Sequence, residues 1–341
     1  MRFPQTGRWL AYSLSLAACA VSLAACNNSD GGGPAPAGGG GGGAASGGGG
    51  GGKKYNIGCT IPTFGHPFFV AMKKGLEEEA QAEGSNIDVV DGKDSSQEQI
   101  SAINNVVVQQ MDALILCPTE TNTLVPGVEK MNKAKIPVIT VNRRVDSGEV
   151  VCYVGADDKD GGKQQGQAVI DAMPKGAKIV LLQGVLGSSP QRDREAGLEE
   201  AIAGKPDFKI IQKIPYQFQR TVAVDKVKTL LLQLPKGEVD VIVAQSDDGA
   251  LAAADVCEKE KRPEIKIIGF NGESDAFNYI KDGKIYATIL QDAETQGREA
   301  VKATIKALKG EKVDKEQITP LYTITKKNID EHKPAWESTK S

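Results

Sequence analysis

Two kinds of hydrophobic pattern alternate along the chain from Tyr55 onward. Short apolar runs rich in β-branched residues have the length of buried strands. Between them, apolar residues recur every three or four positions, which is the period of amphipathic helices. The pattern predicts strands at 56–61, 87–91, 113–118, 137–142 and 151–155, then at 178–183, 209–214, 239–244, 266–270 and 286–290. The helical segments are 68–83, 97–110, 123–133, 192–203, 221–234, 249–259 and 295–309.

This alternation predicts an α/β fold. Strands that alternate with helices form parallel sheets with helices on both faces. About ten strands in two series indicate two such sheets, and therefore two doubly wound lobes. Ligands of open α/β sheets bind beyond the carboxyl ends of the strands, so the strand ends of two lobes can face one another across a cleft.

The first 26 residues predict export. Arg2 and Arg8 precede an apolar run at 9–21, as in a secretory signal peptide. The run is short for a membrane span, and it closes with Leu23-Ala24-Ala25-Cys26, which resembles the lipobox of bacterial lipoproteins. We expect residues 1–26 to be a lipoprotein signal peptide with lipidation at Cys26; the alternative is an uncleaved apolar anchor with an incidental cysteine.

Residues 27–53 are expected to be a flexible tether, because residues 31 to 52 are mostly glycine, with a little alanine, proline and serine, and cannot bury apolar surface. The expected location is the cell envelope, with the protein exported and lipid-anchored at Cys26, facing the periplasm or the cell surface. The membrane that holds the anchor, inner or outer, stays open. Residues 331–341 are expected to be a C-terminal tail.

Composition narrows the possible partners. The chain has 341 residues, a formal net charge of −3 and no long basic block, which argues against nucleic acid. Two histidines and the absence of short-spaced cysteines argue against a metal site. Four cysteines lie beyond the signal segment, and buried thiols are favoured over disulfides without excluding them. They are Cys59, Cys117, Cys152 and Cys257.

Aromatic and polar residues gather directly after the expected strands. The first strand is followed by Thr-Phe-Gly-His-Pro-Phe-Phe at 63–69, and the fourth ends in Pro-Val-Ile-Thr-Val-Asn-Arg at 137–143. Later strands are followed by Arg-Asp-Arg-Glu-Ala-Gly at 192–197 and Gly-Phe-Asn-Gly at 269–272. A stretch at 282–291 reads Asp-Gly-Lys-Ile-Tyr-Ala-Thr-Ile-Leu-Gln.

From residue 55 to about 327, these strings together resemble the ribose-binding family of type I periplasmic binding proteins. The resemblance implies two doubly wound parallel-sheet lobes joined by a three-stranded hinge. The N-terminal lobe would comprise 54–156 plus 292–320, and the C-terminal lobe 157–291 plus 321–330. It also implies a sugar-binding subunit of an ABC transporter, with permease and ATPase subunits as partners and a monomeric head.

The expected ligand-binding residues suit a sugar, whose C–H faces pack on aromatic rings and whose hydroxyls bind planar polar groups. The candidates for aromatic walls are Phe68, Phe69, Phe218 and Phe270. By resemblance, the polar set is Asn142, Arg143, Arg194, Asn271 and Gln291, with His66 and Ser246 at positions where the family has asparagine.

Two departures from the family pattern concern charge. Asn142 and Asn271 stand where relatives usually carry aspartate, which leaves Arg143 and Arg194 less neutralised. The ligand therefore stays open between a neutral pentose, hexose or polyol and an anionic sugar derivative. Because histidine titrates near neutral pH, His66 predicts a mild pH dependence of affinity.

Other functions fit less well. No catalytic triad, metal cluster or nucleotide fingerprint is present, so we expect neither an enzyme nor a cofactor. Gly161-Gly162-Lys163 has the wrong spacing for a phosphate loop and is interpreted as a helix start. A repressor would need an N-terminal helix-turn-helix where this chain has the signal segment. Delivery to a permease and presentation to a chemoreceptor or sensor kinase are not separated by the sequence, and a furanose-like signal remains a further ligand.

Overall fold

The computed structural model describes residues 53–332, so the predicted signal peptide and the lipidation site, nearly all of the tether and most of the tail lie outside the described residues. The first sheet contains β1 (Asn56–Ile61), β2 (Asn86–Asp91), β3 (Ala113–Leu116), β4 (Val138–Val141), β5 (Cys152–Gly155) and β11 (Glu316–Ile318). The second contains β6 (Ala177–Gln183), β7 (Phe208–Pro215), β8 (Val241–Ala244), β9 (Lys266–Asn271), β10 (Ala287–Gln291) and β12 (Leu321–Thr325).

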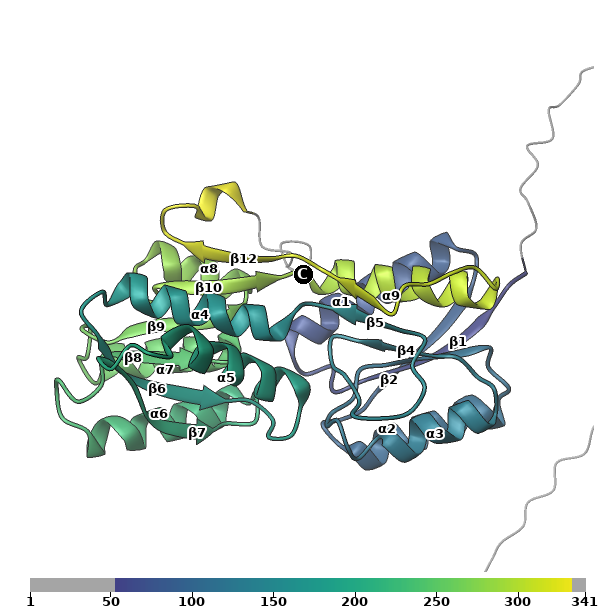
Figure 1. Cartoon of the computed structure of the whole chain (residues 1–341), viewed down its shortest axis with the longest axis horizontal. Coiled ribbons are helices and arrows are strands. Elements are labelled where there is room, and N and C mark those ends of the chain that lie inside the picture. Colours follow the sequence, from purple (N-terminus) through teal and green to yellow (C-terminus); the bar gives the residue numbers. More distant parts are fainter. Residues whose placement is uncertain (1–52, 333–341) are drawn as a thin grey trace, which may run out of the picture. The chain divides into compact units, whose positions relative to one another are not determined.

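Helices cover both sheets (Figure 1). The N-terminal lobe carries α1 (Pro67–Ala82), α2 (Ser96–Val108), α3 (Val125–Lys133) and α9 (Ala293–Leu308). The C-terminal lobe carries α4 (Asp158–Ala172), α5 (Ser189–Ile202), α6 (Arg220–Gln233), α7 (Asp247–Lys259) and α8 (Ser274–Lys281), and a 3-10 turn follows at Ile329–Glu331. Within residues 53–332, no helix is both long and apolar enough to span a bilayer.

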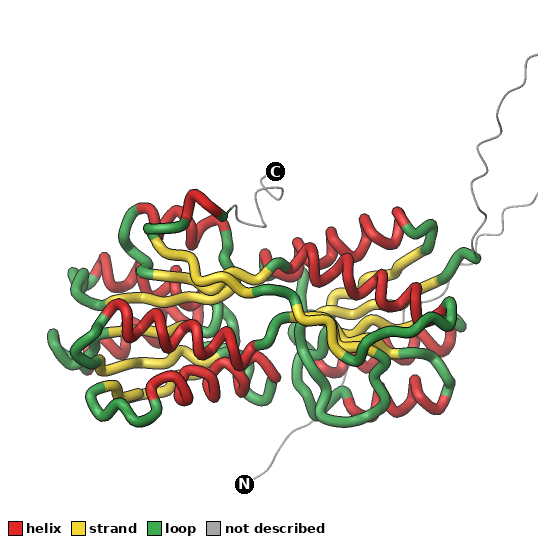
Figure 2. Tube along the Cα trace, turned by 45° about the horizontal axis from the view of Figure 1, so that its top comes forward, coloured by secondary structure: helices red, strands yellow, loops and turns green. Residues whose placement is uncertain are grey.

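The two sheets have matching topologies. Their strand orders are β11-β5-β4-β3-β1-β2 and β12-β10-β9-β8-β6-β7. All pairings are parallel except β10 with β12. The chain passes between the sheets after β5, after β10 and between β11 and β12 (Figure 2). The predicted fold class, two doubly wound lobes with a three-stranded connection, is confirmed.

Each sheet has an apolar cluster on both faces, as expected for a sheet buried between helix layers. In the N-terminal lobe one cluster forms beneath α1 and α9 and another beneath α2 and α3. In the C-terminal lobe the clusters lie beneath α4 and α5 and beneath α6, α7 and α8. The two cores are built separately, so the lobes meet mainly through loops at the strand ends.

Glycines allow one helix pair in each lobe to pack backbone to backbone. A Cβ on Gly75 of α1 would lie 2.2 Å from the carbonyl oxygen of Glu294 on α9. A Cβ on Gly162 of α4 would lie 2.1 Å from the carbonyl oxygen of Arg194 on α5. Gly162 therefore serves helix packing close to the helix start, in line with the interpretation of this motif, and it brings the α5 backbone that carries Arg194 close to α4.

The structure contains three elements that the hydrophobic pattern did not reveal, namely α8, β11 and β12. It also shows that the helix start expected near residue 161 belongs to α4, a helix of 15 residues. The expected strand and helix positions otherwise hold, with shifts of a few residues at the ends. Cys59, Cys117, Cys152 and Cys257 are buried and free, which confirms the favoured interpretation.

Candidate functional site

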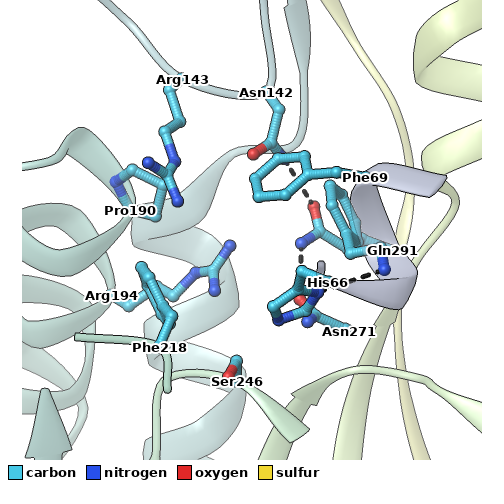
Figure 3. A pocket seen from close by; sticks show the side chains of 11 residues that line it. His66, Phe69, Asn142, Arg143, Pro190, Arg194, Phe218, Ser246, Asn271 and Gln291 are labelled. Carbon is cyan, nitrogen blue, oxygen red and sulfur yellow. Dashed lines mark hydrogen bonds between the residues drawn. The ribbon is translucent and has the colours of Figure 1, made fainter. Parts of the chain in front are cut away.

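A cavity lies where the strand ends of the two lobes meet, and residues from both lobes line it (Figure 3). The space between its lining atoms, including the open solvent at its mouth, is about 310 Å³. Ten of the eleven residues predicted from the sequence line this cavity, and Pro190 completes the lining. The ten are His66, Phe68, Phe69, Asn142, Arg143, Arg194, Phe218, Ser246, Asn271 and Gln291.

Phe270 is the residue that does not line the cavity. Its ring is fully buried, and the guanidinium of Arg194 stacks on it at 3.6 Å from the ring centroid. A Cβ on Gly161 would lie 2.6 Å from the same ring. Phe270 therefore supports Arg194 from beneath, and the expectation that it forms an aromatic wall needs this correction.

Arg194 is held rigidly within the C-terminal lobe. Its Nε and Nη2 atoms each lie 2.8 Å from Oδ1 of Asp158, at the start of α4. Its Nη1 donates to the carbonyl oxygen of Gln245 at 2.5 Å. Burial raises the pKa of Asp158 and the positive charge of Arg194 lowers it, with burial dominating. The pair is almost fully buried, so each partner depends on the other for charge compensation.

Arg143 is buried without such a partner. Its Nη1 donates to the carbonyl oxygens of Pro118 and Thr119, and its Nε is a buried donor without an acceptor. Among residues 53–332, no carboxylate lies within ion-pair distance of its guanidinium. Burial lowers the pKa of Arg143, because the charged form loses solvation. A ligand acceptor would relieve this unmet hydrogen bond.

Cation–π contacts place Arg143 between Phe69 of the N-terminal lobe and Phe218 of the C-terminal lobe. The guanidinium carbon lies 5.4 Å from the Phe69 ring centroid and 5.5 Å from that of Phe218. Phe68 packs edge-on against Phe69, with ring centroids 5.4 Å apart. Both lobes therefore contribute aromatic rings to the cavity wall, as binding the apolar faces of a sugar requires.

Amide side chains form a hydrogen-bonded network across the floor of the cavity. Asn142 donates through Nδ2 to Oε1 of Gln296 and, at 3.4 Å, to Oε1 of Gln291. Gln291 donates in turn to Oδ1 of Asn271 at 2.9 Å. Asn271 donates to Oε1 of Glu273 at 3.1 Å. The network joins the two lobes and engages both polar atoms of Gln291 and Asn271, so that Oδ1 of Asn142 and the second N–H of the Gln291 and Asn271 amides are what it leaves for a ligand.

Several lining residues have a left-handed backbone. Asn142 has φ 62° and Asn271 has φ 120°, values that asparagine tolerates better than most residues. Phe218 has φ 58°, next to Gln217 with φ 60°. A bulky aromatic residue in this region is strained, and such strain is concentrated at functional sites.

His66 caps α1 and touches the other lobe. Its Nδ1 accepts a hydrogen bond from the backbone N–H of Phe68 at 3.2 Å, so the imidazole proton lies on Nε2. Nε2 lies 2.7 Å from Oδ2 of Asp248, in the first turn of α7. Burial lowers the pKa of His66, but the bond to Asp248 and the charge of Glu273 outweigh burial and raise it. His66, Asp248 and Glu273 thus form a group whose ligand atoms lie within 4.8 Å of one another, and hydrogen bonds engage both ring nitrogens of His66.

Two other buried carboxyl groups lie near the cavity. Glu273 is 5% exposed, and burial raises its pKa to about 7. Asp247, in the first turn of α7, is fully buried and uses both oxygens in hydrogen bonds within the C-terminal lobe. Oδ2 accepts from the backbone N–H groups of Gly272 and Glu273, and Oδ1 from the hydroxyl of Thr288. Asp247 therefore shapes the loop after β9 and does not line the cavity.

Pro190 and the hydrogen-bond partners of the lining residues were not expected from the sequence. Pro190 lies in the first turn of α5, where proline is common, so its type gave no sign of a site. Ser246 donates to or accepts from the hydroxyl of Tyr216 at 2.6 Å. Asp158 and Gln296 could have been found from the sequence. Each comes shortly after the end of a strand, at a point where the chain passes between the lobes.

Comparisons with known proteins agree with this architecture. The sequence pattern of the periplasmic binding protein domain matches residues 57–312. The ribose import binding protein of Bacillus subtilis is 34% identical over 275 residues, which cover 81% of this chain and 88% of that protein.

Two solved structures resemble the fold closely. The myo-inositol binding protein of Caulobacter, bound to myo-inositol, has a TM-score of 0.80 at 29% identity, covering 84% of this chain and 98% of that one. An ABC transporter solute binding protein from Mycobacterium smegmatis with bound glycerol has a TM-score of 0.78 at 30% identity, covering 82% and 96%.

These relatives are solute-binding proteins of import systems, and the family is one of exported, cell-envelope proteins. The match spans most of the described residues and both lobes. The chain belongs to the periplasmic binding protein family, as a ribose-binding-like type I sugar-binding protein.

Proposed function

We propose that the protein captures a neutral monosaccharide or polyol, such as a ribose-like pentose or a hexose, in the cavity between the lobes and delivers it to an ABC permease. The observation that carries this proposal is the cavity lining, which combines aromatic rings, two guanidinium groups and amides from both lobes. The ligand-binding residues are the ten that line the cavity, with Phe270 supporting Arg194. The protein acts by binding and not by catalysis.

Closure of the lobes is the proposed mechanism. A ligand that touches both lobes stabilises the closed form by the difference in its affinity for the closed and open forms. The contacts between lobes include a hydrogen bond from the Thr121 hydroxyl to the carbonyl oxygen of Gly187 at 3.0 Å. Arg192 also pairs with Asp146 at 3.0 Å. A permease or a sensor can read the closed surface that results, and we favour the permease because the relatives belong to import systems.

Anchoring at the membrane completes the proposal. Cys26 would carry the lipid, and residues 27–53 would let the folded lobes move above the membrane surface. The wild type should incorporate labelled fatty acid, and Cys26→Ser should not. Equal labelling of the two proteins, or no labelling of the wild type, would contradict the anchor.

An anionic sugar derivative is the second candidate ligand, and Arg143 is the observation that favours it. Its buried guanidinium has an unmet Nε donor and no carboxylate partner within residues 53–332. A carboxylate or phosphate group could bind this planar donor set in pairs. The neutral ligand remains our first proposal, because the amide network offers both donors and acceptors to hydroxyls.

A thermal shift screen with calorimetry tests both candidates. Pentoses, hexoses, polyols, sugar acids and sugar phosphates are added to the purified protein. A ligand at about 1,000 times its dissociation constant stabilises by about 4 kcal/mol. A neutral hit supports the first candidate, and a hit restricted to acids or phosphates supports the second. No hit in either method would contradict sugar binding.

Asn142→Asp sharpens this screen. It adds a carboxylate near Arg143, at the position where the family usually has one, and so lowers the positive charge of the cavity. Binding of a neutral sugar should change by about tenfold or less, whereas binding of an anion should fall by more than about a hundredfold, because like charges then face each other. Gln233→Glu, at the exposed C-terminal end of α6, is a matched control for the added charge.

A further inference from the structure

The single imidazole at the start of α1 connects the two lobes directly. His66 belongs to the N-terminal lobe, and its Nε2 lies 2.7 Å from Oδ2 of Asp248, which belongs to the C-terminal lobe. The two side chains are only 10% and 16% exposed. This contact can exist only when the lobes approach each other, so it is a contact of the closed form.

The position of His66 makes this contact relevant to ligand entry. His66 lines the cavity and also lines a neighbouring pocket that contains Asp94, Gln217 and Asp248. The imidazole therefore forms part of the wall between the cavity and this second pocket. Opening the contact with Asp248 removes part of that wall.

The backbone fixes the direction of the hydrogen bond. Because Nδ1 accepts from the N–H of Phe68, the neutral imidazole carries its proton on Nε2 and donates to Asp248. The Phe69 ring packs edge-on against the imidazole, with centroids 5.7 Å apart. His66 thus reaches Asp248 from a fixed position.

Charged groups from four other segments surround the imidazole. Asp248 on α7 and Glu273 before α8 favour a protonated His66, and Arg143 after β4 disfavours it. Asp94, in the loop after β2, adds a further negative charge. Glu273 lies 3.9 Å from Nδ1. The negative groups outnumber the positive one, so a proton on His66 is stabilised while Asp248 stays close.

We propose that His66 is a positioning residue that, with Asp248, forms an interlobe latch: it draws the lobes together over the cavity, and a proton gained by His66 strengthens this closure. This proposal rests on the proposed function, because the closure that the latch favours is the closure over a ligand. The closed form then binds a proton more tightly than the open form. Closure is favoured at low pH and weakens as the pH rises through the titration of His66 in the closed form.

The first test uses NMR of the imidazole nitrogens without any ligand. The chain has two histidines, so His66 and His332 give two sets of signals that His66→Asn assigns. We expect the proton of neutral His66 on Nε2, and a titration midpoint that falls by about one pH unit in Asp248→Asn. A His66 midpoint that is the same in the wild type and in Asp248→Asn overturns the latch.

The second test measures the compactness of the ligand-free protein by small-angle X-ray scattering between pH 5.5 and pH 8.5. The wild type should be more compact at the acidic end. Asp248→Asn, which keeps an acceptor oxygen but removes the charge, should lose this pH dependence. His66→Asn keeps a capping side chain for α1 and should also lose it. His332→Asn, the matched control, should behave as the wild type, and equal pH dependence in all four proteins overturns the latch.

Binding gives the third readout. For whichever of D-ribose, xylitol or myo-inositol stabilises the protein, Asp248→Asn should weaken binding about tenfold at pH 6, or about 1.4 kcal/mol, and less at pH 8.5. If none binds, the scattering and NMR results still decide on the latch, and the full ligand screen decides on the proposed function. If one binds with the same affinity in both proteins at both pH values, the latch is overturned while the sugar-binding function stands.

Discussion

The two arginines of the cavity are similar in burial but opposite in their electrostatic surroundings. Arg194, from the C-terminal lobe, is paired with buried Asp158 and stacked on Phe270. Arg143, from the N-terminal lobe, has carbonyl acceptors and two aromatic neighbours but an unmet Nε donor. The C-terminal half of the cavity is therefore complete in itself, whereas the N-terminal half retains hydrogen-bonding capacity for a ligand.

Arg194→Ala gives the largest expected effect. It leaves Asp158 buried without its partner, so the free energy of unfolding should fall by about 3–5 kcal/mol. Urea unfolding measures this. Arg192→Ala, which breaks the exposed pair with Asp146, should cost at most about 1 kcal/mol. Equal losses in the two variants would show that the Arg194 pair does not hold the C-terminal lobe together.

Phe270→Ala and Phe218→Ala distinguish a residue that supports Arg194 from a residue that lines the cavity. Phe270 is fully buried, so its truncation should cost about 3–5 kcal/mol in stability. Phe218 lines the cavity with a strained backbone, so its truncation should cost less stability and weaken sugar binding more. Urea unfolding gives the stability of each variant, and calorimetry gives its affinity for the sugar. A larger loss of stability in Phe218→Ala, or a larger loss of affinity in Phe270→Ala, would contradict these two roles.

Arg143→Met should separate stability from binding. The variant keeps an apolar side chain between Phe69 and Phe218. It also removes a buried charge that has no carboxylate partner within residues 53–332. Its unfolding free energy should stay within about 1 kcal/mol of the wild type, or rise. Ligand affinity should fall about ten- to a hundredfold, as expected for lost hydrogen bonds to a charged group. A loss of stability as large as that of Arg194→Ala would remove the contrast between the two arginines.

Glu273→Gln gives the smallest expected effect, which concerns pH. Burial raises the pKa of Glu273 to about 7 in the folded chain, so its contribution to stability is greatest at acidic pH and is lost as the pH rises toward and through 7. The variant should gain stability at pH 8 relative to pH 5, measured as urea midpoints. Glu200→Gln should leave this difference unchanged, because Lys159 and Lys163 hold the pKa of Glu200 at about 2.

Much of the fold followed from the sequence because buried parallel strands and their covering helices have clear periods. Helix α4 was seen only as a start near Gly161, because its first turns carry charged and glycine residues that pack against α5 by backbone contact. The edge strands β11 and β12 are short or half exposed, so their apolar signal is weak.

The site was predicted as a set of positions but not as a set of interactions. Residues at strand ends gather at one edge whatever their identity, which placed Asn142, Asn271 and Gln291 together. Both Phe270 and Asn271 were expected in the site, but neighbours on a strand point to opposite faces, so Asn271 lines the cavity while Phe270 packs against Arg194. The bond between His66 and Asp248 joins residues far apart in the chain, and no local pattern announces it.

The amide network has a direction, and Glu273 sets it. An ionised Glu273 can only accept hydrogen bonds, so Asn271 turns its Nδ2 toward the carboxylate. Oδ1 of Asn271 then accepts from Gln291, and Oε1 of Gln291 accepts from Asn142 of the other lobe. A protonated Glu273 can also donate, which releases this constraint on Asn271. One proton at the edge of the C-terminal lobe thus bears on the orientation of Asn271 and, through it, of Gln291 in the cavity wall.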